Sequence, residues 1–185
     1  MTDFLPLLTG LATTGGLGDL HCGASLPELA ARYGEPWDGG RIHRATRWPH
    51  GFGWGDVQTV FCRCRELRSL SLPVWHGELE LPLPGGASVT LGTRVTESAL
   101  MAALTATGHS WRTVTYENLP DQRNLMFSPA EEVRVELVLT NREAYDEPPL
   151  EEFVLHKAVL WDCDHVDCPE PDGTLPDDGW GAAER

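Results

Sequence analysis

Cysteine residues are the side chains in this sequence whose spacing comes closest to a chemical site. Cys62 and Cys64 are separated by one residue, and Cys163 and Cys168 flank His165 near the C-terminus. Thiolates and imidazoles are ligands that zinc accepts, and alternate residues of a strand share a face, so a predicted strand at Cys62 permits a common site. The spacing differs from the paired C-x2-C of common zinc knuckles. We therefore expect no metal and no cofactor, with zinc binding by Cys62, Cys64, Cys163 and Cys168 left as an open alternative.

Nucleophilic or acid–base catalysis would need a second group placed beside the first. The chain has seven histidines, but no Gly-flanked nucleophile turn orders a Cys–His pair. Only Cys22 precedes a predicted helix start, where a thiol pKa can fall. The adjacent carboxylates Glu131–Glu132 and Glu151–Glu152 would point to opposite faces of a strand. The sequence therefore predicts a protein that is not an enzyme. A thiol- or zinc-dependent enzyme is kept as the last of three hypotheses, after an inhibitor and a ligand-binding domain.

Tryptophan is abundant, with seven residues in 185. Trp37 and Trp48 lie in a polar, Arg- and Gly-rich segment, where exposure to solvent is expected. Tryptophan and arginine are the commonest hot spots of protein interfaces. We therefore predict that Trp37 and Trp48 bind a partner, and packing over the ends of a sheet is the alternative for both.

The formal charge of −14 is distributed unevenly along the chain. Residues 1–142 carry 12 basic and 15 acidic side chains, whereas residues 143–185 carry 2 and 13. Nucleic-acid binding requires a Lys/Arg surface, so this balance argues against it and favours a basic protein partner. We expect the C-terminal tail to dock into a basic groove. The predicted partner-binding acids there are Asp162, Asp164, Asp167, Asp172, Asp177 and Asp178.

Hydrophobic periodicity places three helices and a series of strands. Apolar residues at helical spacing predict a helix over residues 3–12 and another that ends near Thr107. Ser25 and Glu28 form a capping-box pattern ahead of a third helix, which Gly34 ends. Extended patterns cover residues 41–48, 52–63, 67–75, 111–117, 124–127, 133–139 and 153–161.

The order of these elements suggests an internal repeat. Leu20-x-x-Gly23 matches Val89-x-x-Gly92, and each is followed by a helix, a glycine and about three strands. We therefore expect an α+β fold of two tandem helix-plus-antiparallel-meander modules forming a curved sheet. The modules would span residues 1–77 and 89–161, joined by a linker, with an irregular acidic tail over residues 162–185.

This order resembles the tandem repeat of the beta-lactamase inhibitor protein and of the small outer-membrane lipoproteins that share its module. The residues that carry the likeness are Gly23–Leu29 with Gly34, and Gly92–Gly108. The block Gly18–Trp75 also looks like the N-terminal part of actinobacterial immunity-type proteins encoded beside polymorphic toxins. The resemblance implies a protein-binding module whose concave sheet covers the active site of a partner.

These expectations combine into one functional hypothesis. The start of the chain lacks the basic region and long apolar run of a signal peptide, and no stretch approaches the ~20 apolar residues of a membrane span. We expect a cytoplasmic immunity-type inhibitor that binds and occludes the active site of a cognate bacterial toxin acting on nucleic acid, without itself contacting nucleic acid or membrane. The alternative is a small regulatory or ligand-binding domain without catalysis.

Overall fold

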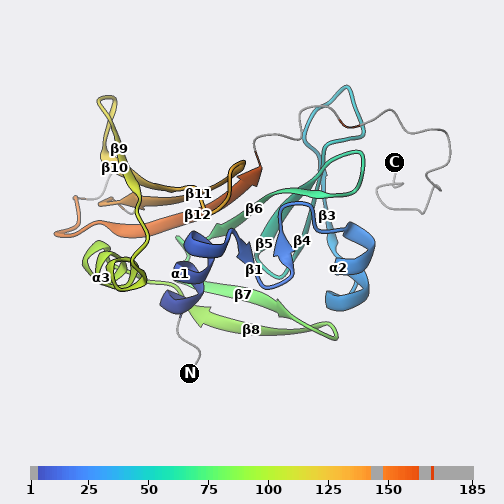
Figure 1. Ribbon diagram of the computed structural model, residues 1–185, viewed down its shortest axis with the longest axis horizontal. Coiled ribbons are helices and arrows are strands. Elements are labelled where there is room, and N and C mark those ends of the chain that lie inside the picture. The colour runs from blue at the N-terminus through green and yellow to red at the C-terminus, as the bar shows by residue number, and fades with distance from the viewer. Residues whose placement is uncertain (1–3, 143–147, 163–167, 169–185) are drawn as a thin grey trace.

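One antiparallel sheet of eight strands dominates the computed structural model, which describes residues 4–142, 148–162 and Cys168. The order of its strands is β3-β4-β5-β6-β12-β11-β10-β9 (Figure 1). The first four are β3 (Trp37–Arg41), β4 (His50–Trp54), β5 (Val57–Phe61) and β6 (Leu67–Pro73). The others are β9 (Arg112–Tyr116), β10 (Leu119–Phe127), β11 (Val133–Thr140) and β12 (Val154–Asp162).

Three helices and two small hairpins complete the described residues. The helices are α1 (Phe4–Thr14), α2 (Leu26–Tyr33) and α3 (Glu97–Thr107). One hairpin joins β1 (Gly16–Leu17) to β2 (Leu20–His21), and the other joins β7 (Glu78–Leu83) to β8 (Ala87–Gly92). Figure 1 shows α1, α3 and the β7–β8 hairpin together on one side of the large sheet. None of the described helices is long and apolar enough to cross a membrane.

The pairing of β6 with β12 joins the two halves of the chain into this sheet. The strands run antiparallel, with Leu70 opposite Leu160 and Leu72 opposite Ala158. All four of these residues are buried. Strands from residues 37–73 and from residues 112–162 therefore form one continuous surface.

The expected α+β architecture of two tandem helix-plus-meander modules is wrong. The described chain is mostly β, and its strands belong chiefly to one eight-stranded sheet rather than to two modules. The predicted linker is also largely strand, since β7 and β8 form a separate two-stranded sheet there. Contacts between α1 and α3 cross the predicted division of the chain. The boundaries 1–77 and 89–161 as domains stay a prediction, and most of the acidic tail lies outside the described residues.

The core lies between the sheet and the elements that cover one of its faces. Alternate residues of β11, namely Val135, Leu137 and Leu139, are fully buried. The register sets Leu137 opposite Leu125 of β10 and Ala158 of β12. Because side chains alternate across a strand, the intervening residues lie on the opposite face, where they are half-buried.

Three local predictions need correction. The run 52–63 is a hairpin and not one strand, because Gly55, at φ +55°, and Asp56 make a two-residue turn between Trp54 and Val57; Gly tolerates this positive φ. The predicted strand 41–48 is mostly connection, because the strand of this region, β3, ends at Arg41. Ser25 precedes α2 but makes no side-chain cap bond.

A pair of neighbouring substitutions tests which face of β11 is buried. Leu137→Ala should lower the free energy of unfolding by about 2–5 kcal/mol, because it leaves a cavity in a close-packed core. Val138→Ala, one residue on and on the other face, should cost about 1 kcal/mol or less. Urea unfolding of both variants gives the comparison, and equal losses would contradict the assigned faces.

Candidate functional site

The face of the large sheet opposite α1 and α3, here called the open face, is the broadest candidate for a binding surface. The register aligns one cross-strand row on it: Gln58, Ser71, Val159, Glu136 and Met126. These residues are half-buried or exposed. A second row contains Val60, Ser69, Trp161 and Arg134. The aromatic, Met and Arg side chains of these rows are of types enriched at protein interfaces, whereas the serines are not.

Trp37 extends the first row at the edge strand β3. It pairs with Gly53, which is opposite Gln58. The Trp37 ring lies where a Cβ of Gly53 would be, so the missing side chain makes room for the indole. Its Nε1–H donates to the carbonyl oxygen of Gly55 at 3.0 Å. Trp37 is therefore held in one orientation while 44% of its surface stays exposed, as a preorganised anchor would be.

A polar cluster occupies the other end of the open face. Asn124 is buried, and its amide donates to the phenolic oxygen of Tyr116 at 3.3 Å and to the carboxylate of Glu136. Gln122 donates to the Asn124 side-chain oxygen at 3.0 Å. A satisfied network of this kind fixes its members. The two ends of the open face thus differ, with a rigid aromatic group at β3 and fixed polar groups at β9–β11.

Trp48, the second predicted partner-binding tryptophan, packs inward. It is half-buried, and its ring lies 5.9 Å from the His50 ring and 6.2 Å from Phe52. This arrangement fits the packing alternative, and a role in binding stays a prediction. The structure does not bring Trp48 into the row of Trp37.

The predicted acidic binding residues are mostly beyond the described part of the chain. Asp162 ends β12, but its side chain is outside the described residues. Asp164, Asp167, Asp172, Asp177 and Asp178 are also outside them. Their proposed role stays a prediction.

His50 and Asp38 form a close polar contact between β3 and β4. His50 Nε2 lies 2.6 Å from Asp38 Oδ1, and His50 Nδ1 lies 3.2 Å from the carbonyl oxygen of Arg47. Both ring nitrogens therefore face oxygen atoms of neighbouring residues. Burial raises the pKa of Asp38, but the hydrogen bonds from His50 and the Gly40 N–H outweigh it and lower that pKa below its usual value. We interpret the pair as a clamp between β3 and β4.

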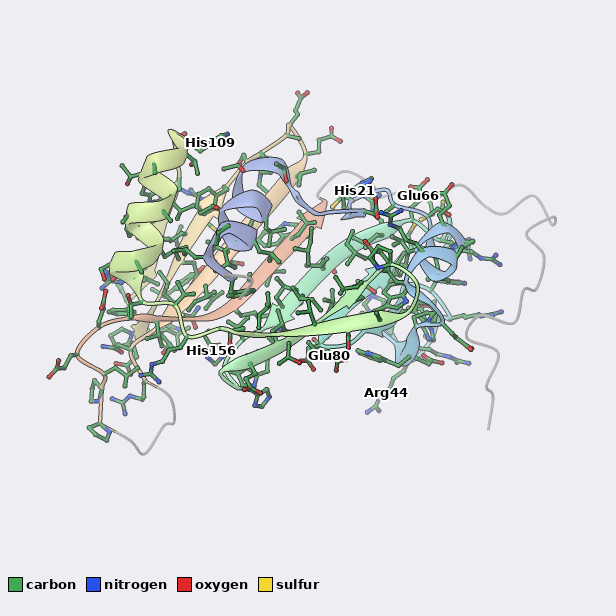
Figure 2. The ribbon with its side chains drawn as sticks, turned by 90° about the horizontal axis from the view of Figure 1, so that it is seen from below. His21, Arg44, Glu66, Glu80, His109 and His156 are labelled. Atoms are coloured by element: carbon green, nitrogen blue, oxygen red, sulfur yellow. The ribbon has the colours of Figure 1, made fainter. Side chains whose placement is uncertain are left out.

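Cys62, Cys64 and Cys168 form a cluster that the sequence left open. Their sulfur atoms lie within 4.8 Å of one another. Cys62 and Cys64 lie in the turn after β5 and not on a strand, which corrects that expectation. Cys163 and His165 are outside the described residues. Glu66, labelled in Figure 2, marks this end of the sheet.

The three thiols differ in the direction in which their pKa is shifted. Burial raises the pKa of Cys62 to about 12, with a further rise from the neighbouring Cys168. Burial also raises the pKa of Cys64. For Cys168, burial raises the pKa, but hydrogen bonds from the Cys64 backbone N–H, the Cys62 and Cys64 thiols and the Arg63 backbone N–H outweigh it, and the pKa is lowered. Of these three thiols, Cys168 alone has a pKa below its usual value.

The remaining catalytic candidates are separated from one another. Cys22 is half-buried and its thiol lies 3.8 Å from the carbonyl oxygen of Arg68. Glu152 accepts a hydrogen bond from the Ser98 backbone N–H at 2.6 Å in the first turn of α3. Such a carboxylate satisfies an otherwise unpaired helix N–H. Glu151 and Glu152 are thus not an acid–base pair within the described residues.

A small cavity of about 240 Å³ lies beside β12, lined by Val74, Trp75, Arg94 and His156 among others. Trp75 stacks on His156 with ring centroids 5.0 Å apart. Burial, with a smaller effect from Lys157, lowers the pKa of His156 below its usual value. Among the described residues, no nucleophile of the Cys cluster lines this cavity. Figure 2 shows His156 near hairpin β7–β8, on a different part of the molecule from Glu66.

Comparison with known proteins assigns this chain to no family. No family model, curated protein or solved structure matches this chain. The resemblance to the beta-lactamase inhibitor protein and to immunity-type proteins therefore stays a prediction.

The predicted exposure of Trp37 is confirmed, whereas the sequence did not indicate the rest of the open face. The signal was present in strands such as β6, where Ser69 and Ser71 alternate with buried Leu70 and Leu72. That alternation does not predict which strands pair with one another. The row through Gln58, Val159 and Glu136 depends on pairing between distant segments.

Gly53→Ala tests the seat of Trp37. The added Cβ would overlap the indole ring and lie 2.6 Å from the carbonyl oxygen of Val57, which is backbone. We expect a loss of about 1–3 kcal/mol in the free energy of unfolding from overpacking. Gly92→Ala, whose Cβ would meet nothing within 4 Å, should change it by less than about 0.5 kcal/mol. If chemical denaturation shows the two variants to be equally stable, the ring does not occupy this position.

The buried His156 should make stability depend on pH. Its pKa in the folded protein is below 6.5, the usual value, so folding favours the neutral ring. The corresponding stability is present above about pH 6.5 and is lost as the pH falls through 6.5 toward the folded pKa. His156→Gln should therefore flatten the fall in denaturation midpoint between about pH 7 and pH 5. His109→Gln, at an exposed site, is the control, and an unchanged slope in His156→Gln would refute the assignment.

Proposed function

We propose that this protein is a cytoplasmic immunity-type inhibitor that uses the open face to cover the active site of a cognate toxin. The observation that carries the proposal is Trp37, held against Gly53 by close packing and by the hydrogen bond to Gly55, yet exposed. An aromatic side chain fixed before binding loses little conformational entropy when a partner buries it. Tryptophan in such a position is a typical hot spot.

The rest of the open face supports a protein partner. Val60, Val159 and Met126 supply apolar area, while Arg134 and Glu136 supply charges of both signs. A surface of this composition resembles a protein interface more than a nucleic-acid site, which requires a concentration of basic groups. The formal charge of −14 favours a basic partner through electrostatic steering. We therefore propose a toxin whose active site binds nucleic acid.

The alternative function, ligand binding without catalysis, has a separate observation in its favour. A largely apolar groove of about 460 Å³ lies between α1, the end of α2 and the β7–β8 hairpin. Leu7, Tyr33, Leu81 and Leu91 are among its lining residues. Its volume is within the range of small-molecule sites. This groove does not include Trp37, so substitutions of Trp37 separate the two functions.

Co-expression with the adjacent open reading frame tests the inhibitor. If that product is toxic, this chain should restore growth and form a complex that survives gel filtration at low salt. Trp37→Ala should weaken the complex by about 30-fold or more, the equivalent of a hot spot of about 2 kcal/mol. Titration calorimetry with an inactive form of the toxin measures this change.

Trp75→Ala is the matched control, because Trp75 is similarly exposed at 47% but lies beyond the end of β6, outside the row of Trp37. It should leave affinity unchanged. A neighbour that is harmless alone, or a complex equally weakened by both substitutions, would contradict the proposal.

A further inference from the structure

The path of the main sheet brings Cys168 to the turn that contains Cys62 and Cys64. Strand β5 ends at Phe61, and the chain turns back into β6 at Leu67. Strand β12 lies beside β6 and runs antiparallel to it, so its C-terminal end approaches the start of β6. Cys168 follows only six residues after the end of β12 at Asp162. Three thiols from segments a hundred residues apart thus meet at one end of the sheet.

The turn itself is held in a defined shape. The Cys62 backbone N–H donates to the Glu66 carbonyl oxygen at 3.0 Å, and the Arg65 N–H donates to the Cys62 carbonyl oxygen at 2.9 Å. Arg65 takes a φ of +62°, which is uncommon for a residue with a side chain. Cys62 is buried, and Cys64 and Cys168 are half-buried. This turn sets the backbone positions of Cys62 and Cys64, and the Cys168 sulfur lies within 4.8 Å of both of their sulfurs.

The spacing of the sulfurs fits a shared ion. A tetrahedral zinc ion with Zn–S bonds of about 2.3 Å sets its sulfur ligands about 3.8 Å apart. All three sulfurs here lie within 4.8 Å of one another, so small side-chain adjustments suffice. A disulfide would join only two of them and leave a third thiol against the bridge. A single cation satisfies all three together.

The backbone of the turn is arranged to stabilise negative sulfur. The N–H groups of Arg63 and Cys64 both donate toward the Cys168 sulfur. Successive N–H groups that converge on one anion form a nest. Partners that hydrogen-bond to a ligating atom orient it and tune the ion. Three thiolates this close would repel one another, so a bound cation would be needed to hold all three ionised.

We propose that Cys62, Cys64 and Cys168 bind a zinc ion that fastens the segment after β12 to the β5–β6 turn. Soft thiolate ligands favour zinc over magnesium, calcium or manganese. On binding, each thiol releases its proton to solvent, and the three thiolates occupy three of the four positions of a tetrahedral ion. The ion links the β5–β6 turn to the segment after β12. Because it binds only the folded state, it raises the free energy of unfolding.

Metal analysis of the full chain tests this site. The protein, purified with a phosphine reductant and without chelator, should retain one zinc per chain. Cobalt replacement should give the visible bands of a tetrahedral ion and a thiolate-to-metal charge-transfer band that scales with the number of Co–S bonds. Zinc should raise the denaturation midpoint, and chelation should lower it.

Single substitutions assign the ligands. Cys64→Ser and Cys168→Ser should each weaken zinc binding by roughly 100-fold or more, beyond the 10–100-fold that loss of an outer hydrogen-bond partner costs. They should also reduce the charge-transfer band by about a third. Cys22→Ser, outside the cluster, is the control and should change neither. Both variants concern half-buried positions, so the test does not depend on the buried Cys62 tolerating a serine.

Three results would overturn the proposal. One is protein without stoichiometric zinc that also fails to bind added zinc under reducing conditions. Another is a native mass lower by two hydrogens, with Cys62 or Cys64 linked to Cys168 after proteolysis, even when the reductant is present. The third is unchanged zinc affinity in Cys64→Ser and Cys168→Ser. None of these bears on the Trp37 interface, so either proposal can fail alone.

Discussion

The antiparallel pairing of β6 with β12 is the constraint on which the rest of the structure depends. It joins strands from both halves of the chain through buried residues such as Leu70 and Leu160. Without it, residues 37–73 and 112–162 would each form a four-stranded sheet with an exposed edge, and such edges are prone to aggregation. The pairing makes one sheet, one core and one continuous open face.

Burial of only one sheet face explains the character of the other. The helices and the β7–β8 hairpin cover the face that carries Leu125, Leu137 and Ala158. The open face keeps β-branched residues, serines and isolated charges, because these fit a pleated and half-solvated surface. Such a face is stable in water, and under the proposed function its apolar residues would contact the toxin. Trp37, held at the edge of this face, would then determine where the partner docks.

The sequence predicted the elements with strong periodicity and failed where pairing decided the outcome. Alternation in 133–139 and 67–75 identified β11 and β6, and helical spacing identified α1 and α3. Strand β3 was missed because two successive glycines, Gly39 and Gly40, are typical of a turn, whereas here Gly39 allows close approach to the Gly51 backbone. The tandem-module fold was wrong because the order of elements does not say which strands are neighbours. Local patterns carry no information on the β6–β12 pairing.

The cysteine cluster also depends on strand pairing that local sequence patterns do not show. Cys62-x-Cys64 looked unsuitable for zinc because its spacing differs from the paired C-x2-C of common zinc knuckles. The third ligand position comes instead from topology, since antiparallel β12 delivers the chain to the β5–β6 turn. The backbone N–H groups of Arg63 and Cys64 that face Cys168 were also invisible, because they depend on the turn's shape. The strand pairing that creates the open face thus also assembles the thiols at its end, and an ion held there would reinforce the pairing that formed its site.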